Sequence, residues 1–127
     1  MKLLAFVISL LLLVGVSYVI FDQEDPKTGL VIRLVGTFKG TLPCADCSGI
    51  ETILKLDLDE TYHLTESYLD RDFVNTNSGI WEISEDLTTL ELVNSQIRYF
   101  IVDHNTLELL DLEGNRINST LNYRLTK

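Results

Sequence analysis

The two cysteines of the chain, Cys44 and Cys47, lie three residues apart. Two thiols this close in sequence can form a disulfide, exchange electrons with another thiol pair or bind a soft metal ion. A disulfide is typical of an exported protein, because such bonds persist in oxidising compartments. A ring this short removes little chain entropy from the unfolded state, so the expected role of the bond is to lock a local conformation.

The two other uses of this pair each meet a physical difficulty. Thiolates select Cu(I) or Zn(II), but a closed zinc site takes four ligands, and His63 and His104 lie far from Cys44 and Cys47 in sequence. The two sulfur atoms could hold Cu(I) linearly, and further ligands for either metal would come from folding or from a second copy. Thiol exchange favours a helix N-terminus, whereas a strand-like run follows this pair and Asp46 disfavours a thiolate.

Pro43, Asp46 and Gly49 frame the cysteines, either to set the angle of the sulfur atoms or as ordinary turn residues. His63 lies among outward-facing polar positions and His104 lies in a turn, so both are expected at the surface. The sequence contains no phosphate loop, zinc-protease motif or pattern that pairs a nucleophile with a base. We therefore expect a protein that is not an enzyme and requires no cofactor, with copper as the one candidate ion.

The N-terminal residues 1–21 are expected to form an apolar helix that is a signal peptide or a membrane anchor. After Lys2, residues 3–21 carry no charge. The length of this run falls between that of a secretory segment and the roughly 20 residues that span a bilayer. Acidic residues follow at once, which predicts an N-terminus inside and a body outside the inner membrane. Residues 13–16 read like a lipobox with Val16 in place of the cysteine, so lipid modification is not expected.

The charge of the chain limits its partners. Ten Lys and Arg face 19 Asp and Glu, for a formal net charge of −9, and every acidic residue follows residue 21. A surface this acidic repels phosphate backbones, which argues against nucleic-acid binding. We expect a protein of the cell envelope on its periplasmic side, either anchored in the inner membrane or released from it.

A polar linker, residues 22–29, precedes one domain, residues 30–127, in which apolar and polar residues alternate. This alternation predicts short strands with one buried face, and the short turns between them predict antiparallel pairing. The pattern indicates an all-β fold, a small barrel of about eight strands, with a bulge or bend at Gly36. Glu66 lies either inside the barrel or at a strand end. The expected strands are residues 30–38, 50–58, 62–68, 79–83, 90–93, 97–102, 107–110 and 121–125.

Residues 36–52 resemble the signature of the NlpE family of bacterial envelope proteins, in its N-terminal domain. The shared pattern is a strand followed by L-P-C-A-D-C-x-G-I-x-T, and the resemblance extends from about residue 34 to the C-terminus through residues 66–69, 78–81, 109–117 and 121–125. It implies a periplasmic lipocalin-like barrel, a link to copper homeostasis, and activation of an envelope-stress sensor. Family members are typically outer-membrane lipoproteins, whereas this chain has Val16 where they have the lipid-bearing cysteine. Longer members carry a second domain, and its roles are not transferred.

The sequence leaves two other functions open. A lipocalin-like barrel can bind one small apolar ligand, unless large side chains such as Phe38, Trp81, Tyr99 and Leu121 fill its interior. A thiol-dependent copper chaperone or oxidoreductase would instead use Cys44 and Cys47 directly.

Overall fold

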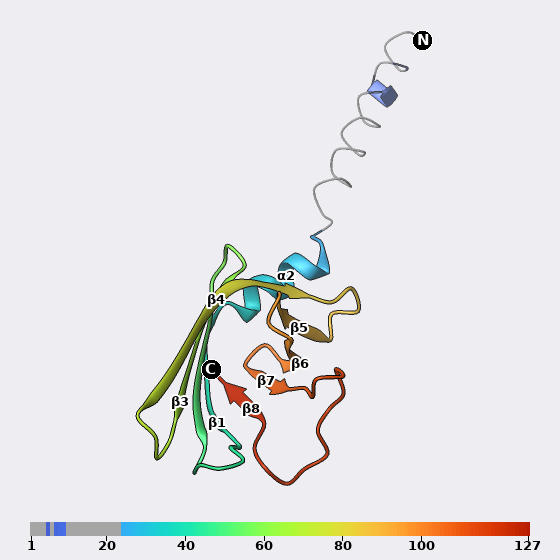
Figure 1. Cartoon of the computed structure of the whole chain (residues 1–127). Helices are drawn as coiled ribbons and strands as arrows, with labels where there is room; N and C mark the ends of the chain where they lie inside the picture. The colour runs from blue at the N-terminus through green and yellow to red at the C-terminus, as the bar shows by residue number, and fades with distance from the viewer. Residues whose placement is uncertain (1–4, 6, 10–23) are drawn as a thin grey trace.

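The residues that the structure describes form a barrel of eight antiparallel strands with a short helix at one end (Figure 1). The structure is a computed structural model and describes residues 5, 7–9 and 24–127. Within those residues, no helix has the length and apolar character that crossing a bilayer requires. The predicted signal peptide or anchor at residues 1–21 lies almost wholly outside the described residues.

Consecutive strands pair with one another around the barrel, and β8 closes it against β1 through the partners Lys39 and Thr126. This confirms the antiparallel barrel of about eight strands. After helix α2 (Pro26–Leu34) come β1 (Gly36–Leu42), β2 (Ile50–Leu56), β3 (Thr61–Tyr68), β4 (Phe73–Ile83), β5 (Thr89–Leu92), β6 (Ile97–Asp103), β7 (Thr106–Leu109) and β8 (Arg124–Thr126).

The strand predicted over residues 30–38 is wrong in its first half, where the chain forms α2. The Asp25 side chain caps the helix by accepting a hydrogen bond from the Lys27 amide, and Pro26 supplies the fixed φ that suits a first helical position. Leu34 is fully buried and Leu30 packs against the core, whereas Ile32, which a strand would have placed beside them, is 58% exposed. Helical spacing therefore decides which side chains reach the core.

Two further local predictions are corrected. Gly36 begins β1 without a bulge, since the β1–β2 register runs unbroken from Gly36 opposite Leu56, and the one irregularity in the described sheet lies between Ile101 and Asp103. The last strand begins at Arg124 rather than at residue 121, and Leu121 is 59% exposed.

The core lies between two walls of unequal length. Strands β1 to β4 form a long wall, and β5 to β8, of which only β6 is as long as β1 and β2, form the shorter one (Figure 1). Of the eleven residues of β4, only Trp81 to Ile83 pair with β5. Most inward-facing residues are large and apolar, and the buried ones include Leu34, Phe38, Leu54, Leu56, Tyr62, Leu64, Trp81, Leu90, Leu92, Tyr99, Leu107 and Leu125.

A buried carboxylate fastens the irregular segment 110–123 to the short wall. The Glu108 side chain is only 10% exposed and accepts hydrogen bonds from Arg116 (Nε to Oε1, 3.0 Å) and Arg124 (Nε to Oε2, 3.0 Å). The Arg116 guanidinium also lies 4.4 Å from the ring centre of Phe100. The hydrogen bond from Arg116, helped by that from Arg124, holds the pKa of Glu108 below its usual value.

We predict that Glu108→Gln lowers the free energy of unfolding by about 1–2 kcal/mol at neutral pH, because it removes a charged hydrogen-bond acceptor from two arginines. The pKa of Glu108 is lower in the folded protein, so this stabilisation is present above the unfolded pKa near 4.5 and is lost as the pH falls through the folded value. Urea unfolding at several pH values measures both effects. Glu113→Gln, on the exposed part of the same segment, is the matched control, and equal losses in the two variants would contradict the prediction.

Candidate functional site

The two cysteines lie in the loop between β1 and β2, residues 43–49, which we call the Cys loop. Cys44 and Cys47 are joined in a disulfide, with their Cα atoms 5.3 Å apart, and both are partly exposed. The Cys loop is at the end of the barrel opposite α2 (Figure 1). A partly exposed disulfide is open to attack by an external thiol, so the loop can accept two electrons and become a dithiol.

The Cys loop is hydrogen-bonded to the turn between β3 and β4, residues 69–72. The amide of Leu69 donates to the carbonyl of Gly49 at 3.0 Å. The amide of Ser48 donates to Asp70 Oδ2 at 3.2 Å, and the Ser48 hydroxyl donates to the same oxygen. These contacts join segments about 20 residues apart in the sequence, so the conformation of the loop sets the position of the turn.

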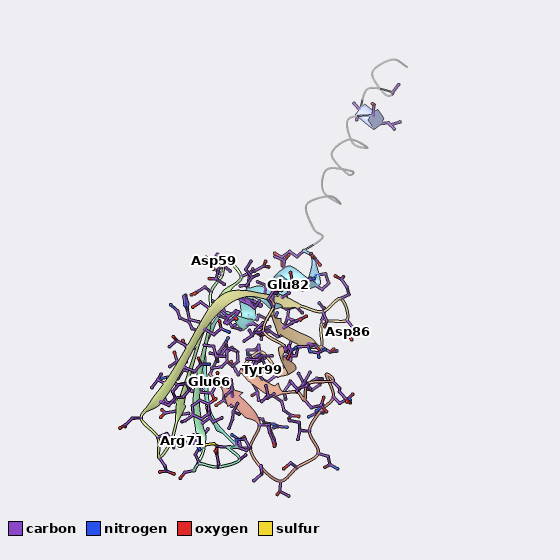
Figure 2. The ribbon with its side chains drawn as sticks, in the orientation of Figure 1. Asp59, Glu66, Arg71, Glu82, Asp86 and Tyr99 are labelled. Atoms are coloured by element: carbon purple, nitrogen blue, oxygen red, sulfur yellow. A yellow bond between two sulfur atoms is a disulfide. The ribbon has the colours of Figure 1, made fainter. Side chains whose placement is uncertain are left out.

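An ion pair between Asp46 and Arg71 adds a third contact between the Cys loop and this turn. Arg71 is at the far end of the β3–β4 hairpin (Figure 2). Both side chains are largely exposed, so the ion pair contributes little to global stability. Because Asp46 lies between the two cysteines, the pair nevertheless orients the loop.

The residues framing the cysteines have separate roles. A Cβ at Gly49 would lie 2.6 Å from Thr41 Cγ2, a distance that side chains do not tolerate, so this position accepts only glycine without a shift. Asp46 forms the ion pair to the turn. Pro43 lies partly exposed between the end of β1 and Cys44. Whether it sets the angle of the sulfur atoms or is an ordinary turn residue stays open.

The surroundings of the sulfur atoms disfavour a reactive thiolate. Asp46 Oδ1 lies 3.6 Å from Cys44 Sγ, and the Gly49 carbonyl lies 3.3 Å from Cys47 Sγ. No helix N-terminus of the described domain lies near the Cys loop to activate a thiol, because α2 is at the other end of the barrel. After reduction the pair would thus be a poorly activated nucleophile.

The histidines predicted at the surface are exposed. His63 Nδ1 lies 3.0 Å from Ser78 Oγ, and His104 lies in the turn between β6 and β7. Among the described residues, no group of three or more His, Cys, Asp or Glu side chains is placed to bind a metal ion.

Ser48, Asp70 and Arg71 were not predicted as part of the site. The sequence shows an Asp-Arg-Asp turn at residues 70–72, and its charges are the one available signal. Its contact with the Cys loop depends on the β2–β3 and β3–β4 registers, which bring two loops to the same end of the barrel.

The barrel interior is filled mainly by aromatic and leucine side chains. Phe38, Trp81 and Tyr99 are buried, as a filled barrel demands, whereas Leu121 lies outside. Glu66 lies on the inner side of β3 and accepts a hydrogen bond from Asn75 Nδ2 at 3.2 Å (Figure 2). Burial, then the nearby Glu66 charge, raises the pKa of Tyr99. Glu66 is thus an interior carboxylate at the end of the barrel that bears the Cys loop.

Comparisons with known proteins agree with this architecture. The family model of the NlpE N-terminal domain matches residues 38–120. Lipoprotein NlpE of Escherichia coli K12 is 38% identical over 92 residues, which are 70% of this chain and 39% of that protein. The 17 kDa lipoprotein of Treponema pallidum is 32% identical over 91 residues, 62% of this chain and 58% of that protein. The chain therefore spans less than two thirds of either relative.

Two solved structures share the fold. A crystal structure from Shewanella oneidensis has a TM-score of 0.67 at 35% identity, and the match covers 74% of this chain and 88% of that one. The crystal structure of the Cpx pathway activator NlpE from E. coli has a TM-score of 0.55 at 38% identity, covering 68% of this chain and 47% of that one.

We predict that opening the disulfide loosens the β3–β4 turn without unfolding the barrel. In the double variant Cys44→Ser/Cys47→Ser, the amides of Ser48 and Leu69 should exchange with solvent at least about fivefold faster, which corresponds to about 1 kcal/mol of local stability. The amide of Gly114, which closes a turn formed by a different part of the chain, is the internal control. Unchanged exchange at Leu69 would show that the loop and the turn are independent.

Proposed function

The chain belongs to the NlpE family, and we propose that it is a non-enzymatic protein of the bacterial envelope that responds to copper or redox stress through its Cys loop. The observation that carries this proposal is the disulfide between Cys44 and Cys47, in a loop with three contacts to the β3–β4 turn. A chemical change at the sulfur atoms would thereby alter the shape of one end of the barrel.

The proposed signal is a two-electron change at the disulfide. A dithiol reductant would give two electrons and two protons to the Cys44–Cys47 bond and would itself become a disulfide. Asp46, within the ring, and Ser48, beside it, would then be free to move away from the turn. A change of surface shape, rather than turnover of a substrate, would be the output.

The proposed partner is an envelope-stress sensor protein. The E. coli relative is described as an activator of the Cpx pathway, and relatives are called lipoproteins rather than enzymes. We place the domain on the periplasmic side, with residues 1–21 serving as a signal peptide or as an anchor in the inner membrane. Val16 in the lipobox position supports an anchor other than lipid.

Copper would act on the reduced form. The oxidised loop has no thiolate to offer, whereas the dithiol has the two soft ligands that Cu(I) prefers. A chaperone or oxidoreductase fits the loop less well, because Asp46 stands 3.6 Å from Cys44 Sγ and no helix N-terminus lies at the loop. A small-ligand carrier is less favoured too, because Phe38, Trp81 and Tyr99 fill the barrel.

We predict that the reduced full-length chain, in detergent and under a competing chelator, binds about one Cu(I) through its two thiols. The oxidised protein and the Cys44→Ser/Cys47→Ser variant should not compete with the chelator. Titration of Cu(I) monitored by the absorbance of the chelator complex measures this. Equal binding by the double variant would place copper elsewhere.

We also predict that cells carrying the full chain and a reporter of the envelope-stress response show a changed response to copper when the cysteines are replaced. Arg71→Gln should shift the reporter in the same direction, because it removes a contact between the turn and the intact Cys loop. Arg33→Gln, which removes the same charge from α2 at the opposite end, is the matched control. An unchanged response in the double cysteine variant, at equal protein level, would contradict the proposal.

A further inference from the structure

A row of polar side chains crosses the inner face of the long wall, between two apolar rows. The strand registers place Thr52 opposite Glu66 and Glu66 opposite Asn75, so these three side chains are neighbours on one face of the sheet. We call Thr52, Glu66 and Asn75 the polar row. The next row toward α2 includes Phe38, Leu54 and Leu64, and the next row toward the Cys loop consists of Leu42, Ile50, Tyr68 and Phe73.

The Glu66 carboxylate has few partners within the described domain. Glu66 is partly buried, and one of its oxygens accepts a hydrogen bond from the neutral Asn75 amide (Nδ2 to Oε1, 3.2 Å). The buried Thr52 hydroxyl beside it donates to the Ile50 carbonyl instead, at 3.1 Å. No ion pair within residues 24–127 includes Glu66. A carboxylate partly withdrawn from water, with no cation beside it, favours an external charged donor.

The polar row is open to solvent on the side of β4. Only residues 81–83 of β4 pair with β5, so the short wall does not continue beside Asn75, which is exposed. The side chains of Phe38 and Trp81, which help to fill the barrel, lie nearer α2 than the polar row does. Tyr99 approaches Glu66 from the other wall (Figure 2). A small molecule can therefore reach Glu66 past the exposed part of β4.

Two aromatic rings lie beside the carboxylate on the same face of the sheet. Tyr68 and Phe73 pair across β3 and β4 with their ring centres 5.4 Å apart. Tyr68 follows Glu66 by two residues along β3, so the ring and the carboxylate share a face. Phe73 is 54% exposed, which leaves part of its ring free. A carboxylate and aromatic rings both attract a cation, and the rings also contact apolar groups.

The charge of this chain and of the polar row discriminates among ligands. The net charge of −9 raises the local concentration of cations and lowers that of anions. A fatty acid would bring its own carboxylate toward Glu66, and the two like charges would repel. A neutral apolar ligand would take water from Glu66 and offer no partner in return. An amine that is protonated at neutral pH meets neither obstacle.

We propose that the polar row binds a small organic ammonium ion. The ammonium N–H groups donate to the Glu66 carboxylate, and the apolar body of the ligand lies against Tyr68 and Phe73. The Asn75 amide, which already donates to Glu66, orients the carboxylate. The site is apart from the sulfur atoms, so it does not depend on the redox state of the Cys loop or on copper.

Titration of the full chain in neutral detergent with benzylamine, which is protonated at neutral pH, tests the proposal. Backbone amide chemical shifts follow the binding. We expect a saturable titration with a dissociation constant of about 1 mM, and shift changes centred on Glu66, Asn75 and Phe73. Benzyl alcohol and benzoate have the same ring without the positive charge and should bind at least about tenfold more weakly. A titration without saturation, equal binding of benzyl alcohol, or shift changes centred elsewhere would each overturn the proposal.

Removal of one carboxylate charge provides the matched comparison. Glu66→Gln keeps the size of the side chain and should weaken benzylamine binding at least about tenfold. Glu51→Gln removes the same charge from an exposed position one residue before Thr52 and should change the affinity less than about twofold. Far-ultraviolet circular dichroism confirms that both variants fold. Equal weakening in the two variants would indicate attraction to the overall negative charge, and would overturn the proposal.

Discussion

The unequal length of neighbouring strands is the constraint on which the rest of this structure depends. An eleven-residue β4 meets a four-residue β5, so the barrel closes by hydrogen bonding at one end and leaves the other end of the long wall beyond the closure. The closed end is covered by α2, whose Leu34 is fully buried. The β3–β4 hairpin must be held at the open end by contacts other than strand pairing on both sides.

The Cys loop supplies those contacts. A disulfide across three residues excludes few unfolded conformations, so its effect on global stability through chain entropy is small. Its effect on position is larger, because the ring fixes the directions in which Asp46 and Ser48 meet Arg71 and Asp70. The covalent bond therefore acts mainly on the local shape of the loop.

The period-two alternation predicted the barrel because strands with one buried face have few other ways to cover it. The same alternation misled at α2, where Leu30, Ile32 and Leu34 satisfy a strand pattern by chance. The better signals there were Asp25 and Pro26, which cap and begin a helix. The start of the last strand failed differently. The Tyr123 carbonyl still accepts from the Leu109 amide at 2.8 Å, but the Asn122 side chain bonds the Thr41 carbonyl at 3.2 Å and the Arg124 amide at 3.1 Å.

The site was predictable in its cysteines and not in its partners. The spacing of Cys44 and Cys47 is local, so their disulfide was among the outcomes that the sequence alone predicted. The contact with Asp70 and Arg71 depends on strand registers, and a shift of one residue in the β2–β3 pairing would move the turn away from the loop. The turn held by the Cys loop is also the turn from which β4 departs, so the position of Phe73 depends on contacts between the β3–β4 hairpin and the separate loop that contains the disulfide.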